Sequence, residues 1–298
     1  MKRIFLFVAT NLAILLAVSI VFNVLCAVLG LDPGILAEEG INYETLALYS
    51  LVFGMAGSVI SLLLSKPMAK FSTGARVIDG TEGEAEAWLV ATVADLANRA
   101  GVKCPEVAIY EGEPNAFATG AFRNSALVAV STGIMRSMTR NELRAVLGHE
   151  MSHVVNGDMV TMSLLQGILN ACVLFLAYVI GYLAEGALSG RDGRRRRGGG
   201  GIAYLVRALL RLVLGLAASL VVYAFSRHRE YGADAGSARL LGSPSDMIAA
   251  LRRLGNLQPG VLPDSLKAMG FGGKSMRGLF ATHPSLEDRI AALQSLSV

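Results

Sequence analysis

Long apolar stretches alternate along the chain with segments of mixed polarity. About 20 apolar residues at 1.5 Å per residue cross the roughly 30 Å hydrocarbon core of a bilayer. Four stretches predict four membrane helices, and the first exceeds the apolar region of a signal peptide. The fourth is the weakest, because Arg207 and Arg211 interrupt it. The stretches are 4–30, 45–65, 159–184 and 202–225.

The remaining segments carry the pattern of a soluble domain with helices and a small sheet. Amphipathic spacing predicts helices, and short runs of Val, Ile and Ala between Pro, Gly and Asn predict strands. The expected fold is therefore mainly α with a small β-sheet (α+β). The predicted elements are a helix over 84–100, strands over 106–111 and 126–131, a helix containing 149–153, a helix starting at 243–246 and a last helix ending at 296.

The segment 115–120 follows Pro114, a residue that sheets tolerate at an edge. A free edge strand can pair with an extended peptide as an additional strand, whereas an ordinary hairpin has no such role. Both interpretations are compatible with the composition.

The composition supports a membrane protein. The chain has 298 residues, of which 53% are hydrophobic and only 17% charged, with a mean hydropathy of +0.51; soluble proteins have about 25% charged residues. Cys26, Cys104 and Cys172 lie far apart, so neither a disulfide framework nor a thiolate metal site is indicated. The loop 191–197 carries a net +4, the formal charge of the whole chain, so no nucleic-acid partner is expected. This loop is either a solvated connector or a contact for anionic lipid.

Charge flanking the first two stretches predicts orientation. Basic residues lie at the outer ends of this hairpin and acidic residues in its connector, which places everything after residue 66 in the cytoplasm. Four consecutive arginines at 194–197 would then oppose a full crossing, so the second hairpin is expected to be tilted or shallow in places. The predicted parts are a transmembrane hairpin (1–65), a first catalytic part (66–158), a second membrane hairpin (159–226) and a second catalytic part (227–298).

The chemistry centres on His149-Glu150-Met151-Ser152-His153, an H-E-x-x-H pattern. On a helix, the i, i+4 spacing places both imidazoles on one face, where they can bind one zinc ion beside the Glu150 carboxylate. A capping box at Thr139 and Glu142 supports the helix. Two histidines that are merely core or surface groups remain the alternative.

A catalytic zinc site needs a third protein ligand. Glu230 and Asp234 are four residues apart, so Glu230 could bind the metal while Asp234 accepts the N–H of a ligating imidazole. Surface ion pairing with Arg227 and Arg229 is the alternative for this helix. His228 points elsewhere, and it cannot replace Glu230 while Asp234 keeps its role.

Four motifs in order resemble the HtpX family of bacterial membrane metalloproteases, relatives of the CAAX prenyl endopeptidases. The resemblance covers the whole chain, although the Arg-rich loop is not part of the family pattern. The motifs are N-A-F-A-T-G at 115–120, H-E-M-S-H-V-V-N-G-D at 149–158, S-R-H-R-E-Y-G-A-D at 226–234 and T-H-P at 282–284.

The resemblance implies a zinc metalloendopeptidase whose zincin-like domain, of the gluzincin type, faces the cytoplasm from the bacterial inner membrane. It implies one Zn²⁺ per chain and protein substrates, namely misfolded membrane proteins handled in quality control and stress response. His149, His153 and Glu230 are then the ligands and Glu150 the catalytic base. Arg227, Asn115, Asp234 and His283 also match family positions.

In such a site, Glu150 takes a proton from the attacking water and passes it to the leaving amine. The developing oxyanion needs a donor, for which His283 and Arg227 are the candidates. An ordinary helix cap before Pro284 is the alternative for His283. The Gly/Arg-rich loop is also expected to be open to self-cleavage, since exposed loops of small residues are where nicking concentrates.

Three other functions remain to be weighed. An intramembrane protease would place its motif inside a spanning helix, but Arg140, Glu142 and Arg144 precede this one. A scaffold with structural zinc predicts four protein ligands, and three candidates are found. A prenyl-protein endopeptidase stays open, because lipid-modified substrates would suit a cleft beside a membrane.

Overall fold

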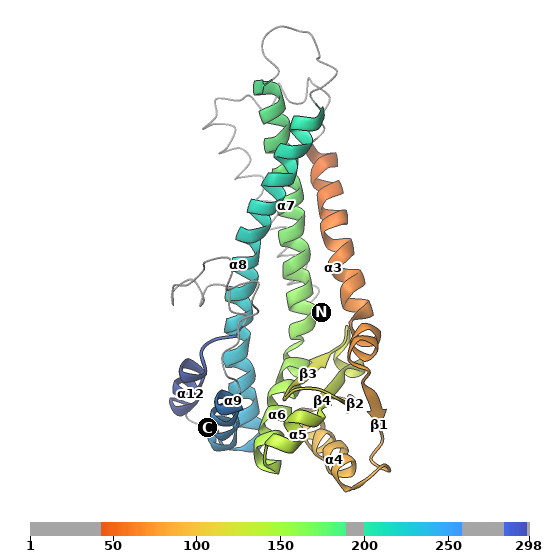
Figure 1. The fold of residues 1–298 in the computed structure, drawn as a ribbon, viewed down its shortest axis with the longest axis vertical. Helices are drawn as coiled ribbons and strands as arrows, with labels where there is room; N and C mark the ends of the chain where they lie inside the picture. The colour runs from red at the N-terminus through yellow and green to blue at the C-terminus, as the bar shows by residue number, and fades with distance from the viewer. Residues whose placement is uncertain (1–42, 189–199, 258–282, 297–298) are drawn as a thin grey trace. The chain divides into compact units, whose positions relative to one another are not determined.

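The computed structural model describes residues 43–188, 200–257 and 283–296 (Figure 1). The first predicted membrane stretch and the Arg-rich loop lie outside these residues. Most described residues are helical, and one four-stranded sheet accompanies them, which confirms the α+β prediction. The elements are α3 (Tyr43–Thr73), β1 (Arg76–Ile78), α4 (Glu84–Arg99), β2 (Glu106–Tyr110), β3 (Ala116–Thr119), η1 (Arg123–Ser125), β4 (Leu127–Ser131), α5 (Thr132–Ser137), α6 (Arg140–Asn156), α7 (Asp158–Leu188), α8 (Gly200–Leu241), α9 (Ser245–Leu257) and α12 (Leu286–Gln294).

The chain divides into two compact units. Unit 1 combines 1–59 with 164–219, and unit 2 combines 60–163 with 220–298. Among the described residues, three helices are long and apolar enough to cross a membrane: Leu46–Thr73, Asp158–Ala184 and Tyr204–Leu241. The fourth predicted stretch is thus part of one continuous helix, because Arg207 and Arg211 do not interrupt α8.

Within unit 1, α3 and α7 pack closely through small residues. A Cβ at Gly54 would lie only 2.4 Å from the Ala171 backbone nitrogen, so the two backbones approach as in small-residue interfaces of membrane helices. Leu46 and Ala47 pack against the buried Phe175 and Val179. A close backbone approach and contacts between apolar side chains therefore hold α3 against α7.

The sheet of unit 2 has the order β1-β2-β4-β3. Strands β2 and β4 are parallel, and the two outer pairs are antiparallel. Side chains alternate between the faces: Val107 and Val128 face the main core with α4 and α6, whereas Ala108 and Ala129 face Ala69 and Ala75 near the end of α3. Strand β3 is an edge strand, as expected after Pro114, and it lies against α6.

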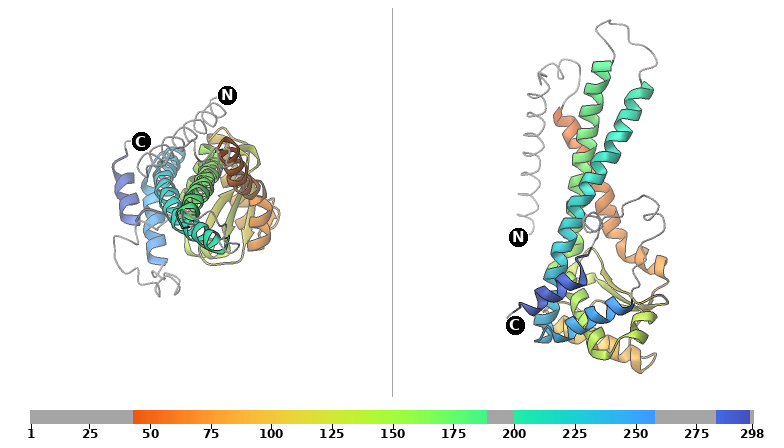
Figure 2. Two further views of the ribbon diagram at one scale, coloured as in Figure 1. Left: turned by 90° about the horizontal axis from the view of Figure 1, so that it is seen from above. Right: turned by 60° about the vertical axis from the view of Figure 1, so that its left-hand side comes forward.

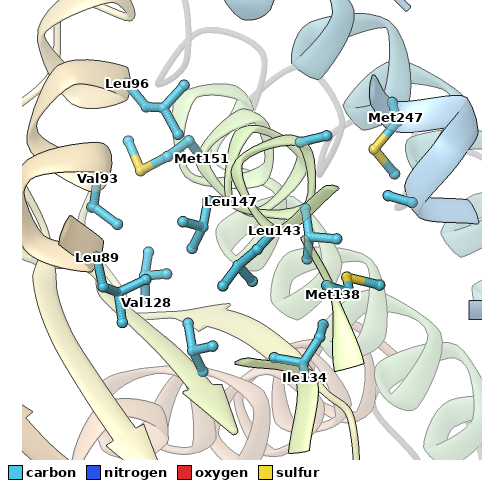
Figure 3. Packing of buried hydrophobic residues seen from close by; sticks show 14 of the residues in the cluster. Leu89, Val93, Leu96, Val128, Ile134, Met138, Leu143, Leu147, Met151 and Met247 are labelled. Carbon is cyan, nitrogen blue, oxygen red and sulfur yellow. The ribbon is translucent and has the colours of Figure 1, made fainter. Parts of the chain in front are cut away.

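The core of unit 2 lies between the sheet, α4 and α6 (Figure 3). Leu89, Val93 and Leu96 of α4 and Leu147 and Met151 of α6 are fully buried there. Helices α9 and α12 lie side by side in both views of Figure 2. Met247 of α9 and Leu293 of α12 complete the core, so the segments before and after the candidate membrane helices α7 and α8 fold together.

Candidate metal centre

Helix α6 holds the H-E-x-x-H residues between two defined ends. The Thr139 hydroxyl accepts the Glu142 N–H, and the Glu142 carboxylate accepts the Thr139 N–H at 2.8 Å, so the predicted capping box is present. At the other end Gly157 has φ 69, the left-handed conformation that glycine adopts without strain. His149 and His153 are therefore one turn apart on one continuous helix.

Helix α8 brings Glu230 to the two imidazoles. His149 Nε2 lies 3.2 Å from His153 Nε2, and the Glu230 oxygens lie 3.4 Å from each of these nitrogens. Two ligands bound tetrahedrally at zinc distances are about 3.3 Å apart. The three donors are thus spaced as a tetrahedral ion requires, and all three residues form the group that could hold a metal.

Each imidazole has a carboxylate on its other nitrogen. His149 Nδ1 lies 2.8 Å from Asp234 Oδ1, and His153 Nδ1 lies 2.6 Å from Asp158 Oδ2. An imidazole that donates its Nδ1–H to a carboxylate presents the lone pair of Nε2. Both rings are therefore oriented with Nε2 toward Glu230.

A buried arginine from α12 anchors the acidic residues of α8. Arg289 donates from Nε and Nη2 to the two oxygens of Asp234 at 2.8 and 2.6 Å, and its Nη1 lies 3.6 Å from Glu230 Oε2. Such a two-point contact fixes the plane of a carboxylate. Arg289 thus holds Asp234 where it meets His149.

Glu230 keeps one oxygen available. Glu230 Oε2 is buried and accepts no hydrogen bond from the described residues, although His283 Nδ1 lies 2.9 Å away. The His283 side chain is 63% exposed, so it approaches the cluster from the solvent side. A buried carboxylate oxygen without an aligned donor fits the part of a metal ligand.

The surroundings favour positive charge at the imidazoles. Burial opposes protonation of His153, but Asp158 and Glu230 raise its pKa to about 9. Burial likewise opposes protonation of His149, and Asp234 and Glu230 raise its pKa. The same carboxylates stabilise a bound cation.

Glu150 lies beside the cluster and near the edge strand. Burial raises the pKa of its carboxyl, while His149, His153 and the Ala118 backbone N–H act in the opposite direction. Ala118 belongs to β3, the edge strand of the sheet, so the Glu150 carboxylate lies against this strand. A peptide added to this edge would pass Glu150.

Small residues allow α6 and α8 to cross at short distance. A Cβ at Gly236 would lie 2.4 Å from Ser152 Oγ, and a Cβ at Gly148 would lie 2.8 Å from Ser237 Oγ. Ser237 Oγ also donates to the Ala145 carbonyl at 2.7 Å. The crossing therefore places Glu230 and Asp234 opposite the histidines.

The other sequence candidates lie around this centre. Arg227 is partly buried one turn before Glu230, and His228 is exposed. Asn115 is exposed at the start of β3, where its backbone N–H donates to Ser131 Oγ at 2.9 Å. The roles of these residues stay predictions.

Sequence reasoning missed Arg289 and Asp158. Arg289 shares a helical face with Leu286 and Leu293, and a charge on the apolar face of a helix was the available signal. Asp158 follows the helix stop at Gly157, and nothing in its spacing marks it as the partner of His153.

Known proteins resemble this chain over its whole length. The model of "Peptidase family M48" matches residues 84–297. The chain belongs to peptidase family M48. Proteins described as "Protease HtpX homolog" are 55% identical in Janthinobacterium sp. (strain Marseille), over 99% of this chain and 100% of the relative, and 54% identical in Bordetella petrii, over 100% of both.

A solved structure shares the fold of this M48 chain. The crystal structure of S. mikatae Ste24p matches with a TM-score of 0.61 at 19% identity, covering 96% of this chain and 66% of that structure. The resemblance to the HtpX family is confirmed, and the M48 chain is a metalloprotease with candidate membrane helices.

Proposed function

We propose that this M48 peptidase is a zinc-dependent endopeptidase of the bacterial inner membrane that cleaves misfolded or damaged membrane proteins. The observation that carries the proposal is the arrangement of His149, His153 and Glu230, with donors 3.2 to 3.4 Å apart and Glu150 on the same helix. The three apolar helices support a bilayer setting. One Zn²⁺ per chain accounts for the donor set, because imidazole and carboxylate in a tetrahedral arrangement suit zinc.

His149, His153 and Glu230 would hold the ion, and Asp234, Asp158 and Arg289 would keep the ligands oriented. Bound there, zinc supplies Lewis acidity that polarises a peptide carbonyl and makes water acidic enough to lose a proton near neutral pH. Glu150 accepts that proton and returns it to the leaving amine.

The edge strand β3 offers a way to bind substrate. An extended peptide can add to a free edge through backbone hydrogen bonds, independently of its sequence. This suits an enzyme that acts on many misfolded chains. His283, on the exposed side of Glu230, and Arg227 are the candidate donors to the oxyanion.

The active site faces the cytoplasm in this proposal. The supporting observation is the distribution of basic residues, with Lys66, Lys70 and Arg76 after the second apolar stretch. Candidate helices α7 and α8 separate the two catalytic segments in sequence, so an even number of crossings is required between them.

A cleavage assay tests the function. The full-length protein is incubated with a panel of membrane proteins, with and without a chelator, and fragments are mapped by mass spectrometry. We expect chelator-sensitive cuts at many sites in unfolded membrane proteins and none with Glu150→Gln. Cleavage confined to prenylated peptides would replace this proposal with the prenyl-protein endopeptidase.

Self-cleavage offers a second readout. The loop 191–201 is rich in Arg and Gly, and an active protease could cut it. Wild-type protein should fragment during detergent purification with zinc present, and Glu150→Gln should stay whole. Equal fragmentation of both would assign the cuts to another protease.

A further inference from the structure

One end of the sheet in unit 2 gathers the start of β2 and the loop between β3 and β4. Glu106 and Thr119 both pair with Leu127, at opposite sides of β4. The Glu106 N–H donates to the Ala126 carbonyl at 3.0 Å. The tip of the β3–β4 connection, which contains Phe122 and Arg123, therefore projects from the same sheet end as Glu106.

Helix α3 reaches the sheet at this end. Lys66 and Lys70 contact the Glu106 carboxylate at 2.8 and 2.6 Å, while β1, which follows α3, starts with Arg76 opposite Ile109. The helix thus runs along the sheet from the Glu106 end inward. The residues of α3 that precede Lys66 within unit 2, 60–65, lie beyond that end, on the side where the β3–β4 tip projects.

Large apolar side chains are exposed on both segments. Leu64, Met68 and Phe71 occupy positions i, i+4 and i+7 of α3, so they share one face, and they are 49%, 57% and 86% exposed. Phe122 at the tip is 66% exposed. Leu64 and Phe122 lie at the Glu106 end of the sheet, and Met68 and Phe71 continue the apolar face of α3 from there. Exposed apolar side chains in such numbers indicate an interaction surface.

The length of α3 indicates what covers this surface. The candidate span Leu46–Thr73 has 28 residues, about 42 Å of helix, whereas the hydrocarbon core is roughly 30 Å thick. The last turns of α3 consequently extend into the headgroup region. Exposed apolar residues there are continuous with a helix that itself enters the bilayer.

Basic residues at the same end of the sheet complement anionic lipid. Lys66 and Lys70 lie on the side of α3 roughly opposite Leu64, Met68 and Phe71, facing Glu106. Lys66 and Lys70 share the single carboxylate of Glu106, which leaves one positive charge in excess. Arg123 Nε is buried without a hydrogen-bond partner, and the guanidinium has no ion pair within the described part of the chain. Basic residues beside exposed aromatic and aliphatic side chains are typical of membrane-interface contacts.

We propose that the end of α3 and the β3–β4 tip form an interfacial zone that contacts an anionic bilayer, with Leu64, Met68 and Phe71 on one side of α3, Lys66 and Lys70 on the other, and Phe122 and Arg123 at the tip. The apolar side chains lie at the boundary of the acyl chains, and the cations contact headgroup phosphates. Strand β3 ends at Thr119, three residues before Phe122. Lipid contact therefore holds the edge strand, and Glu150 beside it, at the membrane surface, whichever peptide bonds the enzyme cleaves.

Depth-dependent fluorescence quenching tests the interfacial zone. The chain has one tryptophan, Trp88, so Trp88→Phe gives a silent background for Phe122→Trp. The matched control is Glu113→Trp, an exposed position in the loop after β2, at the opposite sheet end. Both full-length variants are reconstituted into phosphatidylglycerol/phosphatidylethanolamine vesicles containing lipids brominated near the headgroup or near the bilayer centre.

Shallow brominated lipid should quench Phe122→Trp at least about twofold more than Glu113→Trp, and deep brominated lipid should quench it less than shallow lipid. Adding Arg123→Gln should reduce this quenching in anionic vesicles and leave it unchanged in zwitterionic ones. Equal quenching of Phe122→Trp and Glu113→Trp overturns the proposal and leaves a second protein as the occupant. Both variants should melt in detergent at the same temperature as the Trp88→Phe parent, which would show that the compared proteins are folded.

Discussion

The acidic residues nearest the histidines differ in what each one contacts. Glu150 lies toward β3, Glu230 faces both Nε2 atoms, and Asp234 meets His149 Nδ1 and Arg289. Glu150→Gln should keep its metal while cleavage falls by about 10² or more. Glu230→Gln should lose metal, and Asp234→Asn should lose about 10–100-fold in affinity or activity. Elemental analysis measures the metal content of each variant, and the cleavage rate on one substrate measures its activity.

The metal content of the Glu150 and Glu230 variants decides which residue is the base and which is the ligand. Loss of metal from Glu150→Gln with retention in Glu230→Gln would exchange the roles of base and ligand. His228 would then be the next ligand to test, although its side chain is exposed in this structure.

Arg289 and Asp234 should behave as one energetic unit. Removing one member of a buried ion pair leaves an uncompensated charge and costs about 3–5 kcal/mol. Arg289→Met and Asp234→Asn should each reduce thermal stability, and the double variant should lose less than the sum of the two. The control pair is Arg253→Met with Asp234→Asn, because Arg253 lies 3.5 Å from Glu142 instead. Additive losses in the first pair would contradict a direct coupling.

At the level of single residues, the sequence singled out the three residues that the structure groups better than the residues that support them. His149 and His153 follow from one helical turn of spacing, whereas Glu230 followed from its spacing to Asp234 and from the resemblance to the HtpX family; the structure groups all three, and their role as ligands stays a prediction. Arg289 comes from the last helix of the chain, and only the tertiary fold brings α12 to α8. The partner of His153 was equally hidden, since Asp158 opens the next helix after the glycine stop.

At the level of elements, the crossing of α6 and α8 sets the spacing of the donors. A methyl group at Gly236 would collide with Ser152 Oγ at 2.4 Å and with its Cβ at 2.7 Å. Gly236→Ala should therefore push α8 away and weaken metal binding. Ser152→Gly in the same chain should restore binding, since it removes both colliding atoms. Chelator competition measures the affinity of each variant.

The neighbouring Gly232 supplies the control for this prediction. Nothing lies within 4 Å of a Cβ at Gly232, so Gly232→Ala should keep the metal and gain about 1 kcal/mol of helix propensity. An equal loss of metal in Gly232→Ala and Gly236→Ala would show that α8 tolerates no alanine here for reasons unrelated to the crossing.

The elements themselves were largely readable from the sequence. The capping box, the strands β2 and β4 and the glycine stop follow from local rules, and the structure has each of them. The continuity of α8 did not follow, because the sequence changes from apolar to charged near Phe225 while the helix continues to Leu241. The change in composition indicates where the surroundings of the helix change from lipid to water, and a helix can continue through that boundary.

At the level of the whole molecule, both units are assembled from distant parts of the chain. Unit 2 joins 60–163 to 220–298, and the residues that could hold a metal ion, His149, His153 and Glu230, come from both segments. Positive-inside reasoning favours a tilted or shallow hairpin between them. Helix lengths favour a full double crossing, since the candidate span in α7 has 27 residues and α8 runs from Gly200 to about Phe225 before its charged part begins, against about 20 residues needed. We expect the full double crossing, because an apolar helix that is long enough to span the bilayer is stabilised most when its side chains are buried in lipid.

Cysteine labelling distinguishes these topologies. Gly193→Cys is made with Cys26→Ser and Cys172→Ala, which leaves Cys104, exposed on unit 2, as an internal reporter. Burial raises the pKa of the Cys104 thiol, so labelling is run at mildly alkaline pH. In intact spheroplasts an impermeant reagent should label Gly193→Cys and spare Cys104 until the membrane is permeabilised.

If neither thiol reacts before permeabilisation, the hairpin does not cross, and four consecutive arginines have kept it on the cytoplasmic side. If Cys104 reacts first, the catalytic segments face outward and the orientation drawn from Lys66, Lys70 and Arg76 is wrong.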